Sequence, residues 1–217
     1  MKIKNVIFDL DGTLLDTSKG IIESVEHTVK EMGFPVLSDE ALRSFIGPPL
    51  RNSFMNTCGC TEELANDATK VFRAYYQAGA VLHAESYDGI VELCKFLKEK
   101  GVKLGVATNK PERFAVALID NFGLTGYFTG VFGADETGSL SKTDLIKLCM
   151  KELDASETDT VLIGDTDNDA VGAKQAGVYF LAVSYGFGFR PGDNYSEHHC
   201  IGIADSPMQI ADILVRL

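Results

Sequence analysis

Short runs of apolar residues recur along the chain and predict the strands of one sheet. Each run is rich in β-branched and aromatic residues and ends near acidic residues or glycine, which is typical of a buried strand. Between the runs, apolar residues recur at helical spacing. Strands that alternate with helices predict an α/β fold, with a parallel sheet covered on both faces. The predicted strands are 4–10, 102–107, 128–132, 160–164 and 179–183, and the predicted helices between them are 111–122, 142–152 and 167–176.

The segment 16–82 breaks this alternation, because it contains helical patterns but no convincing strand. Its last helical stretch carries an apolar stripe that includes Leu64, Ala68, Phe72 and Tyr75, and we expect this stripe to pack in a core. The sequence therefore predicts an α/β domain formed by 1–15 and 83–217, with an all-helical domain, 16–82, inserted after the first strand. Helices are expected at 18–32, 39–45, 50–57 and 61–78.

Composition and charge narrow the class of protein. Hydrophobic residues make up 45% of the 217 residues, which is enough for a packed core. The net charge of −11 argues against a nucleic-acid partner, because polyanions bind surfaces rich in lysine and arginine. So acidic a protein would also need a metal ion or a local basic residue to hold an anionic substrate.

The apolar runs and the cysteines indicate the cellular location of the protein. No stretch approaches the roughly 18 apolar residues that a membrane span needs, and the first residues are too acidic for a secretory signal. The five cysteines are scattered, which favours reduced thiols. A metal or redox role for Cys58 and Cys60 is disfavoured, because no second Cys/His pair lies near them. We expect a cytoplasmic protein without a membrane partner.

Carboxylates follow two of the predicted strands. Asp9 and Asp11 come directly after the first strand, and Asp165 and Asp169 come after the strand at 160–164. Ligands of an open parallel sheet bind beyond the carboxyl ends of its strands, so these groups would gather at one edge. At about 4 Å and an effective dielectric constant of about 20, each pair of carboxylates would cost roughly 4 kcal/mol. A bound Mg²⁺ would offset that repulsion. The alternative for Asp9 and Asp11 is a simple acidic turn, because Asp-Gly is a common turn dipeptide.

Two further strand ends supply groups that could bind phosphate. Thr108 and Asn109 are expected at the start of a helix, where hydroxyl and N–H groups bind anions, although Thr108 could simply cap that helix. Lys142 is expected in the first turn of another helix, where its charge opposes the helix dipole. A phosphoryl group and a nucleophilic aspartate would justify such a lysine, whereas a solvated surface lysine is the alternative.

Together these segments resemble the haloacid dehalogenase-like hydrolase superfamily in its phosphatase branch. The resemblance covers the whole chain: DLDGTLLDT from Asp9 is its first motif, Thr108 the second, Lys142 the third, and Asp165 with Asp169 the fourth. The helical segment 16–82 looks like the cap domain of that superfamily. The resemblance implies a Rossmann-like, three-layer α/β/α core with the first strand in the middle of the sheet.

The resemblance also implies a mechanism. Asp9 would attack phosphorus and form an aspartyl-phosphate, and Asp11 would protonate the leaving group and then help to activate water. Mg²⁺ would be held by the Asp9 carboxylate, the main-chain carbonyl of Asp11 and Asp165, while Asp169 orders its waters. The phosphoryl oxygens would be bound by Thr108, the Asn109 N–H and Lys142.

Within the superfamily, the presence of Asp11 disfavours a dehalogenase. The stretches 12–17 and 45–51 look like phosphoglycolate phosphatases and related nucleotidases or pyrophosphatases. We expect a Mg²⁺-dependent phosphatase that acts on a small phosphorylated metabolite, as a monomer or homodimer. Arg51 is expected to meet a second anionic group of the substrate, and Arg190 is a weaker candidate for substrate contact. The alternatives are a 5′-nucleotidase or pyrophosphatase, a sugar phosphomutase and a non-catalytic binding module.

Overall fold

A computed structural model describes residues 2–135, 139–190, 192–193 and 200–216. The chain forms two compact units, one made of Met1–Asp16 and Ser86–Leu217 and the other of Thr17–Glu85. The helical unit was expected at 16–82. Two short strands, β2 (Leu15–Asp16) and β3 (Glu85–Ser86), pair with each other where the chain passes between the units.

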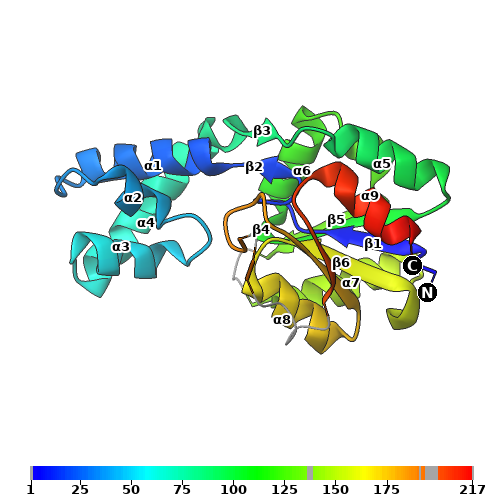
Figure 1. Cartoon of the computed structure of the whole chain (residues 1–217). Coiled ribbons are helices and arrows are strands. Elements are labelled where there is room, and N and C mark those ends of the chain that lie inside the picture. The colour runs from blue at the N-terminus through cyan, green and yellow to red at the C-terminus, as the bar shows by residue number, and fades with distance from the viewer. Residues whose placement is uncertain (1, 136–138, 191, 194–199, 217) are drawn as a thin grey trace. The chain divides into compact units, whose positions relative to one another are not determined.

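The larger unit is built on a sheet whose strands run in the order β5-β4-β1-β6-β7-β8, with every neighbouring pair parallel (Figure 1). The central strand β1 is buried along its whole length, and Val6, Ile7 and Phe8 present apolar side chains to both faces of the sheet. The expectation that the first strand lies in the middle is therefore confirmed. The strands are β1 (Asn5–Phe8), β4 (Lys103–Pro111), β5 (Gly130–Ala134), β6 (Thr160–Gly164), β7 (Tyr179–Val183) and β8 (Cys200–Ala204).

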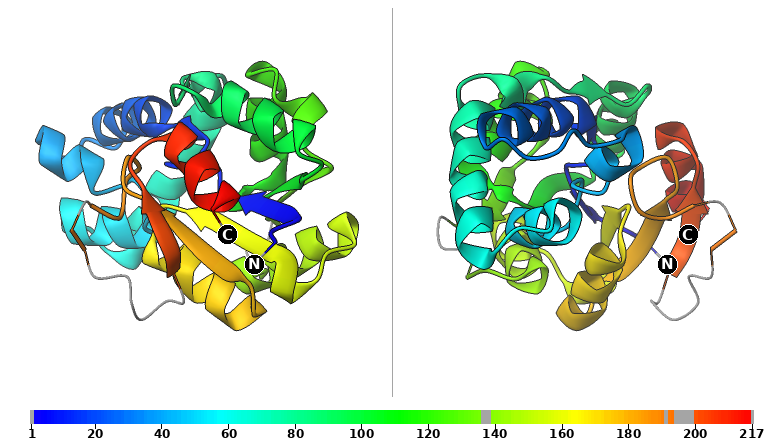
Figure 2. Two further views of the ribbon diagram at one scale, coloured as in Figure 1. Left: turned by 45° about the vertical axis from the view of Figure 1, so that its right-hand side comes forward. Right: turned by 90° about the vertical axis from the view of Figure 1, so that its left-hand side faces the viewer.

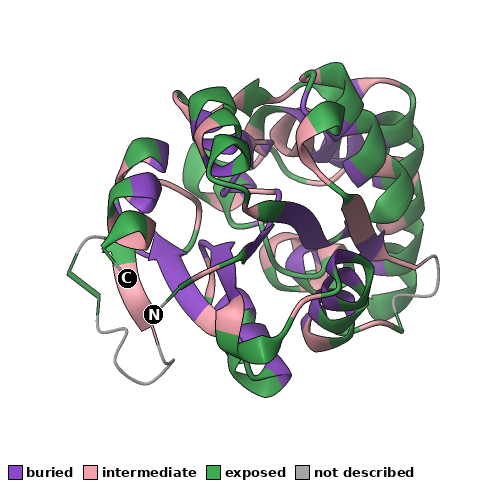
Figure 3. Ribbon diagram, turned by 90° about the vertical axis from the view of Figure 1, so that its right-hand side faces the viewer, coloured by how far each residue is buried: buried purple, intermediate pink, exposed green. Residues whose placement is uncertain are grey.

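Helices cover both faces of this sheet, as the two views of Figure 2 show. One face carries α5 (Ile90–Glu99), α6 (Glu112–Asn121) and α9 (Pro207–Val215), and the other carries α7 (Lys142–Leu153) and α8 (Asp167–Ala176). The core under α7 and α8 is formed by apolar side chains from both helices and from the sheet. Figure 3 shows the result, with buried strands inside and exposed outer faces on the helices. The predicted three-layer α/β/α fold is confirmed.

Among the strands of the main sheet and the helices that cover it, α5, β8 and α9 were not predicted. The apolar residues of α5 do recur at helical spacing and are buried, so its signal is present in the sequence. The signal of β8 is weak, because this edge strand is only partly buried and contains Gly202. The strand β4 is longer than predicted and continues to Pro111 after a register shift at Thr108. Short 3₁₀ turns occupy Thr125–Tyr127 and Glu157–Asp159.

The smaller unit is helical, as its periodicity predicts. Aromatic rings fill its core, with Phe45 and Phe54 packed edge to face at a centroid distance of 4.9 Å. The buried face of α4 is formed by Ala65, Ala68, Phe72 and Tyr76, so the predicted stripe was wrong in including Leu64 and Tyr75, which are exposed. The unit contains α1 (Ser18–Glu31), α2 (Asp39–Arg43), α3 (Leu50–Cys58), α4 (Glu62–Gln77) and the 3₁₀ turn Ala80–Leu82.

Among the residues that the structure describes, no helix combines the length and apolarity needed to cross a membrane.

Candidate active site

The carboxyl ends of β1 and β6 lie side by side in the middle of the sheet, and each is followed at once by an aspartate. Asp9 follows β1, and its amide donates a hydrogen bond of 2.8 Å to the carbonyl of Ile163 in β6. Asp165 follows Gly164 at the end of β6. Because the strand order runs outward in opposite directions from β1 and β6, the crevice beyond them is where sheets of this kind bind ligands.

A tight turn carries the chain from Asp9 past Asp11. The carbonyl of Leu10 accepts hydrogen bonds from the amides of Thr13, Leu14 and Leu15 at 3.2, 3.0 and 3.0 Å. Gly12 sits in this turn with φ of 82°, a conformation that a residue with a Cβ rarely adopts. The turn therefore keeps Asp11 close to the end of β1 and directs the chain away from the sheet.

Three carboxylates form a buried cluster at the centre of the site. Asp9, Asp165 and Asp169 each offer an oxygen, and these oxygens lie within 4.8 Å of one another. The side chain of Asp165 is 0% exposed and that of Asp169 is 2% exposed, so water offers little screening. Such a cluster is stable only where protons or cations compensate its charge.

Lys142 supplies one of those cations. Its ammonium nitrogen lies 2.5 Å from Oδ1 of Asp9 and 2.7 Å from Oδ1 of Asp169. Burial alone would lower the pKa of Lys142, but the carboxylates of Asp169 and Asp9 raise it above the ordinary lysine value. The structure thus excludes a solvated surface lysine at this position.

The start of α7 explains how a lysine in a first helical turn reaches the cluster. Ser141 and Asp144 form a capping box that satisfies the exposed amides of the turn. The Lys142 side chain then crosses α8 at Gly172, where an added Cβ would lie 2.7 Å from Cγ of Lys142. Gly172 therefore leaves the space through which the lysine reaches the two carboxylates, whose charge offsets the helix dipole.

Each carboxylate oxygen of Asp169 already has a partner within the protein. Its Oδ2 accepts hydrogen bonds from the amide and hydroxyl of Thr166, at 3.0 and 2.6 Å, in the capping box of α8, and its Oδ1 faces Lys142. Asp165 precedes α8, which begins at Asp167 as predicted. The two carboxylates meet because Gly164 allows the helix to approach the strand: an added Cβ there would lie 2.5 Å from the Asp169 side chain.

Asp165 fits a metal ligand better than a structural acid. Its Oδ2 accepts hydrogen bonds from the amides of Phe187 and Gly188, at 2.7 and 3.3 Å. Its Oδ1 is buried without a hydrogen-bond partner among the described residues. A buried acceptor that lacks a partner is costly. With two more carboxylates beside it, a divalent cation bound by oxygen ligands would satisfy that atom, so the residues fit Mg²⁺.

The raised pKa values of Asp9 and Asp165 also indicate that the cluster lacks sufficient positive charge. Burial, with a smaller contribution from Asp169 among the nearby charges, raises the pKa of Asp165 to about 7. Burial also raises the pKa of Asp9 to about 8, although Lys142 acts in the opposite direction. A divalent cation would favour the ionised form of both groups. A cation bound at this site would therefore take the place of protons on Asp9 and Asp165.

Thr108 reaches the same edge of the sheet through β4, which pairs with β1 so that Val106 lies beside Phe8. Its hydroxyl is buried and accepts a hydrogen bond of 3.2 Å from the amide of Lys110. Asn109 is exposed. We expected a helix to start at Thr108, but the chain stays extended and α6 starts at Glu112 with Pro111 before it, so Thr108 is not a helix cap.

Lys110 is a residue of the site that the sequence analysis missed. Its ammonium nitrogen lies 2.8 Å from Oδ1 of Asp11, and its side chain is only 6% exposed. In an extended chain residues i and i+2 point the same way, so Thr108 and Lys110 are both buried while Asn109 between them is exposed. Knowledge that β4 continues beyond Thr108 would have identified this lysine.

The two arginines proposed for substrate contact make contacts within their own units. Arg51 lies in the first turn of α3 and forms an exposed ion pair of 2.7 Å with Glu62 of the helical unit. Arg190 donates to backbone carbonyls of the segment that precedes it. A substrate role for either residue stays a prediction.

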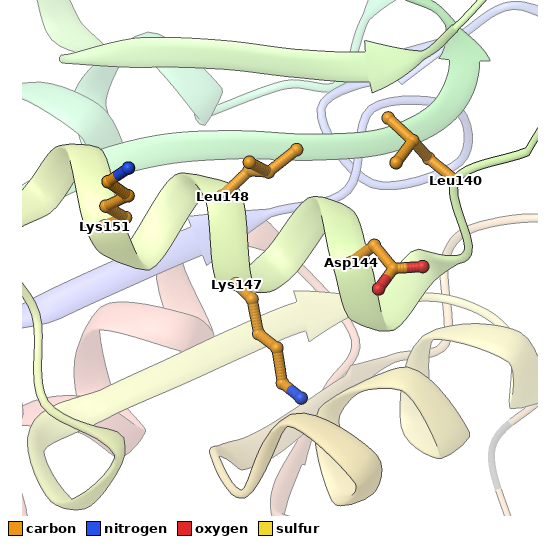
Figure 4. A pocket seen from close by; sticks show the side chains of 5 residues that line it. All are labelled: Leu140, Asp144, Lys147, Leu148 and Lys151. Atoms are coloured by element: carbon orange, nitrogen blue, oxygen red, sulfur yellow. The ribbon is translucent and has the colours of Figure 1, made fainter.

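A separate hollow of about 370 Å³ lies along α7 (Figure 4). Its lining comes from the exposed side of that helix and from Leu140, and it contains none of the clustered carboxylates. We assign the active site to the carboxylate cluster and not to this hollow, because the lining of the hollow consists of two lysines, one capping carboxylate and aliphatic side chains. The lining residues are Leu140, Asp144, Lys147, Leu148 and Lys151.

Comparison with known proteins agrees with this geometry. The family model of the haloacid dehalogenase-like hydrolases matches residues 6–183, which include both strand ends of the acidic cluster as well as Thr108 and Lys142. The chain belongs to this family. The predicted recognition is therefore confirmed, and so is the prediction of an enzyme of the phosphatase class within the family.

Among similar proteins, a 5′-nucleotidase of Pseudomonas aeruginosa is 32% identical, and the alignment covers 94% of each chain. A phosphoglycolate phosphatase of Pseudomonas savastanoi pv. phaseolicola is 35% identical over 85% of this chain and 70% of its own. The crystal structure of a predicted phosphatase from Clostridium acetobutylicum superposes with a TM-score of 0.88 at 33% identity, over 100% of both chains. The Clostridium acetobutylicum protein therefore has the same fold as this chain over its whole length.

Proposed function

We propose that the chain is a Mg²⁺-dependent phosphatase that hydrolyses small phosphate monoesters through an aspartyl-phosphate on Asp9. The observation that carries this proposal is the buried cluster of Asp9, Asp165 and Asp169, in which Oδ1 of Asp165 has no partner among the described residues. The cluster lies at the strand ends where a sheet of this topology binds ligands.

The metal would be held by the carboxylates of Asp9 and Asp165 and by the main-chain carbonyl of Asp11, while Asp169 orders its waters. When bound, Mg²⁺ supplies positive charge to the transferring phosphoryl group. Lys142 adds a second positive charge at the same place, since its ammonium group already contacts Asp9 and Asp169. These charges offset the local negative charge that would otherwise repel a phosphate monoester.

In the first step an oxygen of Asp9 attacks phosphorus, and the bond from phosphorus to the leaving oxygen breaks. Asp11 donates a proton to that oxygen, so the alcohol leaves uncharged. In the second step Asp11 takes a proton from water, and the water oxygen attacks the phosphorus of the aspartyl-phosphate. Phosphate is released and Asp9 returns as a carboxylate.

Residues near the carboxyl end of β4 and at the start of α7 would position the phosphoryl group. The Thr108 hydroxyl, the Asn109 amide and the Lys142 ammonium group would bind the phosphoryl oxygens, since each can donate a hydrogen bond. Preorganised donors and charges of this kind supply most of the catalysis in phosphoryl transfer.

Phosphoglycolate-like acids are the first substrates to test, and the similar phosphoglycolate phosphatase supports that choice. The similar 5′-nucleotidase supports nucleoside monophosphates as the second choice. In either case the helical unit Thr17–Glu85 would act as the cap, with Arg51 meeting a second anionic group. We expect a small phosphorylated metabolite as the partner and the cytoplasm as the location.

A screen of phosphorylated metabolites for inorganic phosphate release tests the proposal. Turnover is expected with Mg²⁺, is expected to stop after EDTA treatment, and should return when Mg²⁺ is added back. Asp9→Asn should abolish release from every substrate, whereas Asp212→Asn, an exposed aspartate of α9, should leave it unchanged. Full turnover without a divalent cation, or by Asp9→Asn, would overturn the proposal.

A further inference from the structure

The segment 184–190, which follows β7, folds back over Asp165. The amides of Phe187 and Gly188 donate to Oδ2 of Asp165, at 2.7 and 3.3 Å, and the amide of Phe189 donates to its main-chain carbonyl at 2.8 Å. The segment therefore occupies one oxygen of the carboxylate and leaves Oδ1 without a partner among the described residues.

Glycines make this close approach feasible. A Cβ added at Gly186 would lie 2.5 Å from Cβ of Asp165, and one added at Gly188 would lie 2.4 Å from its carbonyl oxygen. A Cβ added at Gly12 would lie 2.2 Å from Oδ2. Glycine is required at 186 and 188 for steric reasons, because backbone atoms and Asp165 occupy the positions that a Cβ would take.

The exposed side chain of Arg190 forms hydrogen bonds with backbone carbonyls of this segment. Its Nη1 donates to the carbonyls of Gly186 and Phe189, both at 3.0 Å, and its Nη2 donates to the carbonyl of Phe187 at 3.0 Å. These carbonyls belong to the same stretch of backbone whose amides hold Asp165. The planar guanidinium group suits this task, because it presents several donors in a fixed arrangement.

Two aromatic residues anchor the ends of the segment to the rest of the unit. Phe189 is buried against Phe180, with a centroid distance of 6.0 Å, and the hydroxyl of Tyr185 donates to the carbonyl of Thr13 at 2.9 Å. Thr13 belongs to the turn that follows Asp11. The segment is thus fixed both to the core and to the turn that carries the catalytic aspartates.

We propose that Arg190 and the 184–190 backbone position the Asp165 carboxylate for the cation, and that Arg190 is a positioning residue without substrate contact. The proposal rests on the Mg²⁺ site of the proposed function. Two amides on Oδ2 fix the rotation of the carboxylate, so Oδ1 stays available without a search among rotamers. Without the ties from Arg190, the amides of Phe187 and Gly188 would hold Asp165 less firmly and the affinity for Mg²⁺ would fall.

The test is the binding of Mg²⁺ alone to the full chain, measured by isothermal titration calorimetry without substrate. Arg190→Gln removes the guanidinium group, and Arg190→Lys keeps the charge but not the arrangement of donors. Gly188→Ala perturbs the same segment from the inside. Arg216→Gln, an exposed arginine just after α9, is the matched control. Circular dichroism confirms that each variant is folded.

Arg190→Gln, Arg190→Lys and Gly188→Ala should each weaken Mg²⁺ binding by about tenfold, the lower end of the range for losing a direct partner of a metal ligand, because they act through the amides that hold Asp165. Arg216→Gln should bind as the wild type does. With Mg²⁺ raised to saturation, the KM of Arg190→Gln for p-nitrophenyl phosphate should stay within about twofold of the wild type, since only the metal ligand is affected.

Three results would overturn parts of the account separately. If the wild-type chain itself does not bind Mg²⁺, the metal site of the proposed function is wrong. If the wild type binds and the loop variants bind equally well, the positioning role is wrong. If Arg190→Gln binds Mg²⁺ normally but has a raised KM, whereas Arg190→Lys does not, Arg190 contacts the substrate through its charge.

Discussion

The ammonium nitrogen of Lys110 lies 2.8 Å from Oδ1 of Asp11, and the lysine is almost completely buried. A lysine that loses water must keep a negative partner, so the two side chains hold each other in place. Lys110 comes from the end of β4 and Asp11 from the turn after β1, so the pair links two neighbouring strand ends. It places a positive charge at Asp11, the aspartate that we propose as the proton donor.

Removal of Lys110 should therefore destabilise the fold. Lys110→Met is expected to lower the free energy of unfolding by roughly 2–3 kcal/mol, between the values for exposed and buried ion pairs, because Asp11 is partly exposed. The double variant Lys110→Met/Asp11→Asn should lose less than the sum of the single variants. Urea denaturation measures all three changes, and additivity within about 0.5 kcal/mol would show that the two residues are not coupled.

Lys142 is expected to matter more than any other lysine of α7. Lys142→Met leaves Asp9 and Asp169 buried without their common cation, which should lower the free energy of unfolding by roughly 3–5 kcal/mol in the absence of metal. Phosphate release should be lost as well. Lys147→Met on the exposed side of the same helix should change stability by less than about 0.5 kcal/mol. Equal effects of the two substitutions would contradict the assigned role of Lys142.

The stability of the metal-free protein should depend on pH through Asp9 and Asp165. Their pKa values are raised in the folded chain to about 8 and about 7, whereas unfolded aspartates titrate near 4. Between these values the folded state binds more protons than the unfolded state, so stability is greatest at low pH and falls as the pH rises from about 4 to about 8. Thermal unfolding in EDTA should show this decline.

Mg²⁺ should reverse this decline, because the ion takes the place of the protons. The stabilisation by Mg²⁺ should thus be larger at pH 8 than at pH 5. Asp165→Asn, which removes one of the titrating groups, should flatten the metal-free profile. A profile in EDTA that rises steadily from pH 4 to pH 8 would show that these carboxylates are not held in the protonated form.

For Arg51 we predict a role that depends on the substrate. Arg51→Ala should raise KM for a substrate with a second anionic group more than for p-nitrophenyl phosphate. Since Glu62 holds this guanidinium group at 2.7 Å, Glu62→Gln should free it and leave KM unchanged or lower. Steady-state kinetics on both substrates decide the point, and equal effects of Arg51→Ala on the two would reduce Arg51 to a surface residue.

Much of this architecture could be predicted because its signals are local. Apolar runs identified β1, β6 and β7, and helical spacing identified α7 and α8. Asp9 and Asp165 could be placed together without a structure, since the carboxyl ends of parallel strands meet at one edge of the sheet.

The rest depends on contacts that sequence patterns do not contain. Lys110 faces Asp11 only because β4 stays extended beyond Thr108, where a helix start was expected. The amides of Phe187 and Gly188 reach Asp165 across more than twenty residues of sequence, which depends on how 184–190 folds back. The hydrogen bonds from Arg190 to the carbonyls of Gly186, Phe187 and Phe189 likewise depend on how this segment folds.

The central claim is the covalent intermediate on Asp9, and trapping it is the most direct test. p-Nitrophenolate is a good leaving group that needs little protonation, so Asp11→Asn should still be phosphorylated but should hydrolyse the intermediate slowly. Hydroxylamine added during turnover with Mg²⁺ converts an aspartyl-phosphate to a stable hydroxamate, which peptide mass spectrometry locates. We expect the hydroxamate on Asp9 in Asp11→Asn and none in Asp9→Asn/Asp11→Asn. Turnover by the wild type with no modification on Asp9, or with modification at another residue, would contradict the account.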